Sequence, residues 1–111
     1  MNILFKDDKE KEMYQNPDTL RKKFGLQIAK MITKRIQELQ AFSSIGELLS
    51  SGIGKGHFLK GDYKHCLALS LTGNYRLIVQ PFFEDDTDFS VLKTHNLNIV
   101  IIIKVEDYHG K

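Results

Sequence analysis

The sequence of 111 residues has one cysteine, no tryptophan, two prolines and no long apolar run. A single thiol excludes an intrachain disulfide and a cysteine-rich zinc site, and Cys66 beside Leu67 is predicted to be a small buried residue. The longest apolar run, Ile99–Ile103, is far too short to span a bilayer, and the first residues do not resemble a signal peptide. We therefore expect one cytoplasmic domain over residues 1–111, with no membrane partner, no metal and no cofactor.

The net charge of +2 is too small to identify a partner, but its distribution is uneven. Residues 1–65 carry 12 Lys and Arg against 8 Asp and Glu, whereas residues 66–111 carry 4 against 6. The positive excess lies on and after a predicted helix and includes Lys34 and Arg35. This pattern is compatible with an RNA-contacting face, and a solvated helix surface is the alternative.

The first half of the chain reads as a strand followed by helix. Asn2–Phe5 is a short strand candidate, and Asn16-Pro17-Asp18 combines an Asx cap, a first-turn proline and an early acid. Apolar residues then recur every three or four positions as far as Phe42, which predicts one buried helical stripe of roughly seven turns. Gly25 lies inside this stretch and predicts a slight break.

The second half reads as strands. Glu47–Leu49 is predicted to form a further helical turn, and residues 50–56 are predicted to form a loop. The acidic segment 84–98 is predicted to be a long loop before the final strand. Strands are predicted at His57–Lys60, Cys66–Leu71, Tyr75–Phe82 and from Ile99. Helices followed by strands predict an α+β fold, in which an N-terminal strand and a helical hairpin pack on a mostly antiparallel sheet of about four or five strands. Besides the helical stripe, we expect a core of Leu69, Leu71, Leu77, Val79, Ile101 and Ile103.

The end of the chain places an acid, a phenol and an imidazole side by side, at Asp107, Tyr108 and His109. Side chains of these kinds, held at the end of a rigid strand, suit general acid/base chemistry. His57 lies at the start of another predicted strand, and Arg76 lies inside a third. Each of these residues also has a structural alternative. Arg76 could pair with Glu106, His57 could simply cap the sheet edge, and Lys60-Gly61-Asp62 could be only a tight turn.

Three segments in this order resemble the RelE/HigB-type toxins of bacterial type II toxin–antitoxin systems. They are His57-Phe58-Leu59-Lys60-Gly61-Asp62, Asn74-Tyr75-Arg76-Leu77-Ile78 and Val105-Glu106-Asp107-Tyr108-His109-Gly110-Lys111. The resemblance implies a metal-independent, ribosome-dependent mRNA endoribonuclease that a helix-turn-helix antitoxin inactivates. It implies that the RNA 2′-OH attacks the adjacent phosphate and that the 5′-oxygen leaves.

The resemblance also implies roles for the residues that match these segments. His57 and His109 are expected to carry protons, Arg76 to bind phosphate oxygens, and Asp107 to orient an imidazole or act as base. Tyr108 is expected to stack on a base or position a phosphate, and Lys60 to contact a second phosphate. A ParE-like gyrase inhibitor or an inactive binding module of the same fold is the alternative, and the acids of segment 84–98 would repel RNA if they lay near the cleft.

Overall fold

The computed structural model describes residues 1–82 and 94–108. The order of the elements is β1 (Asn2–Phe5), α1 (Asp8–Gln15), α2 (Pro17–Phe24), α3 (Leu26–Ala41), α4 (Ile45–Ser51), β2 (His57–Phe58), β3 (Leu67–Ser70), β4 (Tyr75–Pro81) and β5 (Ile99–Asp107). Short 3-10 turns at Ile53–Lys55 and Gly61–Tyr63 flank β2. Within these ranges no helix has the length and apolarity needed to cross a membrane.

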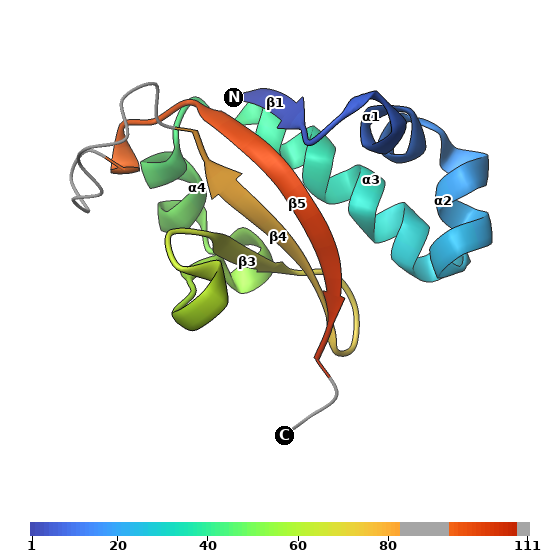
Figure 1. The fold of residues 1–111 in the computed structure, drawn as a ribbon. Coiled ribbons are helices and arrows are strands. Elements are labelled where there is room, and N and C mark those ends of the chain that lie inside the picture. Colours follow the sequence, from blue (N-terminus) through green and yellow to red (C-terminus); the bar gives the residue numbers. More distant parts are fainter. Residues whose placement is uncertain (83–93, 109–111) are drawn as a thin grey trace.

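The five strands form one sheet in the order β1-β5-β4-β3-β2. β1 pairs parallel with β5, and each of the other neighbouring pairs is antiparallel. Figure 1 shows α1, α2 and α3 gathered beside the strands, with the long curved β5 crossing in front of β4. The predicted α+β fold with a mostly antiparallel sheet is therefore confirmed.

The helical region differs from its prediction in two ways. The start at Asn16 is confirmed, because the Asn16 side chain accepts hydrogen bonds from the backbone N–H groups of Asp18 and Thr19 at 3.0 and 3.2 Å. The expected break at Gly25 is present and is complete rather than slight: Gly25 has φ +86° and ψ 164° and separates α2 from α3, so the prediction of one helix as far as Phe42 is wrong. The charged segment before Asn16, for which no helix was predicted, forms α1, capped by Asp7, whose carboxylate accepts from Glu10 N at 2.8 Å.

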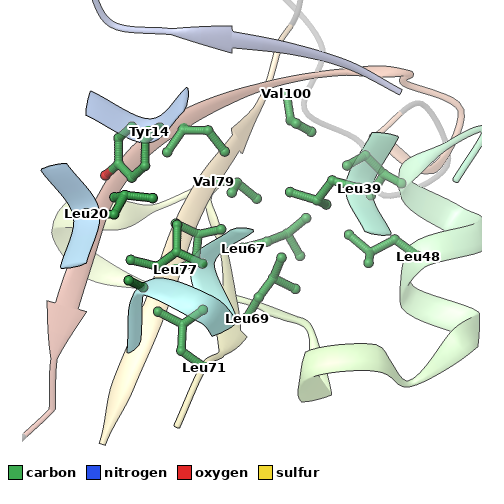
Figure 2. Packing of buried hydrophobic residues seen from close by; sticks show 14 residues of the cluster. Tyr14, Leu20, Leu39, Leu48, Leu67, Leu69, Leu71, Leu77, Val79 and Val100 are labelled. Carbon is green, nitrogen blue, oxygen red and sulfur yellow. The ribbon is translucent and has the colours of Figure 1, made fainter. Parts of the chain in front are cut away.

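The main core lies between the helices and the sheet. Figure 2 shows buried side chains of α1, α2, α3 and α4 meeting those of β3, β4 and β5. Of the predicted helical stripe, Leu20, Ile32 and Leu39 are fully buried, and the remaining apolar residues pack against them partly buried. The predicted strand residues Leu69, Leu71, Leu77 and Val79 are also buried.

The prediction of which β5 side chains face the main core is wrong by one residue. Val100 and Ile102 are the fully buried residues that join the main core, whereas Ile101 and Ile103 are only half-buried. Successive side chains of a strand point to opposite faces, so the residues next to a core position face the other side of the sheet.

The other side of the sheet carries a smaller apolar cluster. Its buried residues are Cys66, Ala68 and Ile78, and the partly buried side chains of Leu59, Tyr63 and Ile103 pack against them. Cys66 is buried as predicted, and burial raises the pKa of its thiol. No helix α1–α4 contributes to this cluster, so we call this side of the sheet the open face.

Candidate functional site

Strand register determines which polar side chains share the open face. Directly opposite residues of an antiparallel pair lie on the same face. Ala68 and Ile78 are open-face residues; His57 pairs with Ala68, and Lys104 pairs with Ile78. Two residues farther along β4, Arg76 pairs with Ser70 on one side and with Glu106 on the other. The open face therefore carries His57, Arg76, Lys104 and Glu106.

Arg76 is held by the β3–β4 turn and faces Tyr108. Its Nη1 donates to the carbonyl oxygens of Gly73 at 3.1 Å and Tyr75 at 3.0 Å. Its guanidinium carbon lies 5.9 Å from the centroid of the Tyr108 ring, within the range of a cation–π contact. Tyr108 N donates to the Asn74 carbonyl at 2.9 Å, which fixes the start of the tail beside the same turn. The structure thus brings two of the predicted site residues, Arg76 and Tyr108, together.

Glu106 lies across from Arg76 but bonds to other groups. Its Oε2 is 2.9 Å from Lys104 Nζ and accepts a hydrogen bond of 3.4 Å from the Tyr63 hydroxyl. The hydrogen bonds to Glu106 and Tyr63 raise the pKa of Lys104, so this lysine stays charged. The alternative in which Glu106 neutralises Arg76 is therefore not what the structure shows.

Lys104, Glu106 and Tyr63 were not predicted as site residues. The alternation of Lys104 and Glu106 directly after the apolar run was the available signal, because such spacing places two side chains on one strand face. Nothing local in the sequence indicated that Tyr63, in the 3-10 turn, would reach them.

Asp107 lies on the other side of the sheet from Arg76. It pairs with Tyr75, whose ring packs against the main core, and together they line a hollow of about 290 Å³ with Gln27 and Ile28 of α3. The expected convergence of Asp107 and Arg76 on one surface is therefore not seen, because β5 continues through Asp107 and its side chains alternate. His109 lies outside the described residues.

His57 and Lys60 lie at the edge of the open face. His57 is exposed on the edge strand β2, with Nδ1 3.0 Å from the Lys55 carbonyl oxygen. β2 is two strands from β4, which corresponds to about 10 Å between the two backbones. Lys60 is exposed and directly precedes the turn Gly61–Tyr63, where Gly61 has φ +73°. The tight turn at Lys60-Gly61-Asp62 is thus present.

Lys34 and Arg35 of α3 are placed differently from each other. Arg35 Nε donates to the Ser70 carbonyl at 2.8 Å, and its Nη1 lies 2.7 Å from Glu38 Oε1. Only 12% of the Arg35 side chain is exposed, so its guanidinium joins α3 to β3 and does not face solvent for an RNA phosphate. Lys34 is exposed and lines a groove between α2 and α3, away from the open face.

Comparison with known proteins identifies similar folds. No family model and no curated protein matches the sequence. Among solved structures, a YoeB/ParE toxin from Agrobacterium tumefaciens has 13% identity and a TM-score of 0.57, and the match covers 98% of this chain and 100% of that one. The YoeB–YefM complex from Staphylococcus aureus contains a chain with 20% identity and a TM-score of 0.56, matched over 99% of this chain and 98% of that one. Identities this low establish the fold, and the chain therefore has the α+β fold of the YoeB/RelE-type toxins, as its sequence motifs predicted.

Proposed function

We propose that this protein is the toxin of a toxin–antitoxin pair and acts in the cytoplasm as a ribosome-dependent mRNA endoribonuclease. The observation that carries the proposal is the arrangement of Arg76 and Tyr108 on the open face. A guanidinium offers a planar, permanently charged fork for phosphate oxygens, and an aromatic ring beside it offers a surface on which an RNA base stacks. A sheet face that carries both suits an extended single strand of mRNA.

The proposed reaction is transphosphorylation by the RNA itself. The 2′-oxygen attacks the adjacent phosphorus, the bond to the 5′-oxygen breaks, and Arg76 stabilises the charge that develops on the phosphoryl oxygens. His57 and His109 are the proposed proton carriers, since an imidazole exchanges protons near neutral pH. Lys60, exposed beside β2, is proposed to contact a neighbouring phosphate. Lys34 remains a proposed RNA contact on the helical side, whereas the buried hydrogen bonds of Arg35 favour a structural role.

The proposed partners are the ribosome, its mRNA and an antitoxin. A YoeB toxin of similar fold is solved together with YefM as a heterotetrameric toxin–antitoxin complex. We propose that this chain is likewise neutralised by an antitoxin and, following the resemblance of its motifs, that this antitoxin has a helix-turn-helix domain.

Controlled expression in bacterial cells tests the proposal, with Arg76→Ala as the matched variant. The wild type should stop translation and produce mRNA 5′ ends within codons at the ribosomal A site. Arg76→Ala should lower the cleavage rate by about 10²–10³, because one transition-state contact is lost. The unfolding curve of the variant should stay close to that of the wild type.

The alternative function is inhibition of DNA gyrase, because one of the similar structures is a YoeB/ParE toxin. DNA breaks and an SOS response with intact mRNA would overturn the nuclease proposal. Full toxicity of Arg76→Ala would overturn the assignment of the site.

A further inference from the structure

The two carboxylates at the end of β5 face opposite sides of the sheet. Glu106 pairs with Arg76 on the open face, whereas Asp107 pairs with Tyr75 and lines the hollow beside α3. Directly opposite residues of an antiparallel pair have Cα atoms about 4.5–5.5 Å apart, so Glu106 is within side-chain reach of a phosphate bound by Arg76. The strand geometry therefore selects Glu106 over Asp107 as the carboxylate nearest to the proposed phosphate site.

The neighbours of Glu106 hold its carboxylate in one orientation. Lys104 Nζ and the Tyr63 hydroxyl both approach the same oxygen, Oε2, at 2.9 and 3.4 Å. Within residues 1–82 and 94–108, Oε1 of Glu106 has no hydrogen bond, and 26% of the side chain is exposed. One carboxylate oxygen is thus anchored while the other is accessible from the open face.

Stability alone gives a weak reason for this arrangement. The Lys104 side chain is 45% exposed, and an ion pair between exposed groups typically contributes only about 0–1 kcal/mol to folding. A carboxylate with one anchored oxygen and one accessible oxygen has the geometry that a proton acceptor needs.

We propose that Glu106 is the general base of the endoribonuclease reaction, an assignment that rests on the proposed function. Oε1 of Glu106 takes the proton of the RNA 2′-OH as the 2′-oxygen forms its bond to phosphorus. The bond between phosphorus and the 5′-oxygen breaks, and the leaving oxygen takes a proton from an imidazole of the site. The products are a 2′,3′-cyclic phosphate and a free 5′-OH, with the proton now on Glu106. Lys104 and Tyr63 are positioning residues that act through the other oxygen.

The experiment measures single-turnover cleavage of mRNA on purified ribosomes by the full chain. Four proteins are compared: the wild type, Glu106→Gln, Glu106→Asp and Glu12→Gln. Glu12→Gln is the control, because Glu12 is an exposed carboxylate on α1. Glu106→Gln should lower the rate by about 10²–10⁴, the usual contribution of a general base, while ribosome binding stays unchanged. Glu106→Asp keeps a carboxylate on a shorter side chain and should recover part of the loss. Glu12→Gln should cleave at the wild-type rate.

A second substrate separates a base from an acid. An mRNA with sulfur in place of the 5′-bridging oxygen has a leaving group that needs no proton, so it should restore the rate of a variant that lacks the general acid. Glu106→Gln should stay slow on this substrate. A restored rate, or a Glu106→Gln rate within threefold of the wild type on normal mRNA, would overturn the assignment.

Tyr63→Phe tests the positioning role. Loss of its hydroxyl should lower kcat about tenfold with KM unchanged, since the carboxylate is less well oriented and RNA binding is unaffected. An unchanged kcat would remove Tyr63 from the proposal. Wild-type protein that cleaves no mRNA on ribosomes would instead count against the proposed function, so the two failures are distinguishable.

Discussion

Tyr14 is the clearest case of a single side chain whose ionisation is coupled to folding. It is 6% exposed on α1, stacks on Phe5 with ring centroids 5.9 Å apart, and belongs to the main core. Burial, followed by the nearby charge of Glu10, raises its pKa from 10.0 to about 12. The protonated phenol is thus favoured in the folded state.

We expect the stability of the protein to fall between about pH 10 and pH 12. The contribution of Tyr14 is fully present below the unfolded pKa of about 10 and is lost as the pH rises through the folded value of about 12. A shift of this size corresponds to at most about 2–3 kcal/mol. Tyr14→Phe retains the ring and should show a weaker pH dependence, measured by urea unfolding at several pH values.

The difference between the two proteins isolates Tyr14, because Cys66 and the other titrating groups are common to both. Parallel stability curves for the wild type and Tyr14→Phe across this range would contradict the prediction.

At the scale of elements, Gly25 is responsible for the turn between α2 and α3. Its φ of +86° and ψ of 164° lie in a region that is essentially restricted to glycine. A Cβ at this position would meet nothing within 4 Å, so the restriction comes from the backbone and not from crowding by neighbours.

Gly25→Ala should therefore lower the free energy of unfolding by about 1–3 kcal/mol. Leu26→Ala is the matched control, because Leu26 is 54% exposed and should change stability by less than about 0.5 kcal/mol. Chemical denaturation of both variants checks this. Equal stability of Gly25→Ala and the wild type would mean that α2 and α3 join into one helix without penalty.

Local signals and long-range signals differ in what they predicted. The Asn16 cap and the tight turn at Lys60-Gly61-Asp62 were predictable, because both depend on a few adjacent residues. The phase of β5 was not, since a run of five aliphatic residues has no polar position that marks its outward face. A register shift in β5 opposite Ile78 and Val79 then resets the alternation, so that Glu106 and not Asp107 faces Arg76. No residue of the sequence marks this bulge, so the sequence did not show which of the two carboxylates lies across from Arg76.

At the scale of the whole molecule, Arg35 connects the helical layer to the sheet. Its guanidinium bonds to Glu38 on α3 and to the Ser70 carbonyl on β3, and it is largely buried. A hydrogen bond that involves a charged group typically contributes about 1.5–3 kcal/mol, and the half-buried Glu38 carboxylate left without its partner adds to the loss.

Arg35→Ala should lower the free energy of unfolding by about 2–4 kcal/mol, whereas Lys34→Ala should change it by less than about 0.5 kcal/mol. The two residues are adjacent on the same helix, so the comparison controls for helix propensity. Thermal and urea unfolding of both variants provide the measurement. Similar effects of the two substitutions would show that the buried guanidinium is not a structural link.

The position of β5 in the sheet has a consequence for the order of events during synthesis. β5 lies between β1 and β4, and Asn2 of β1 pairs with Ile99 of β5. β1 therefore cannot pair in the sheet until β5 has been synthesised. Pairing over such a sequence separation is slow, because a long loop must close before any contact forms. A nascent chain that ends before residue 99 has neither β5 nor the residue that faces Arg76. The translating ribosome is therefore exposed to the assembled open face only after β5 has been made.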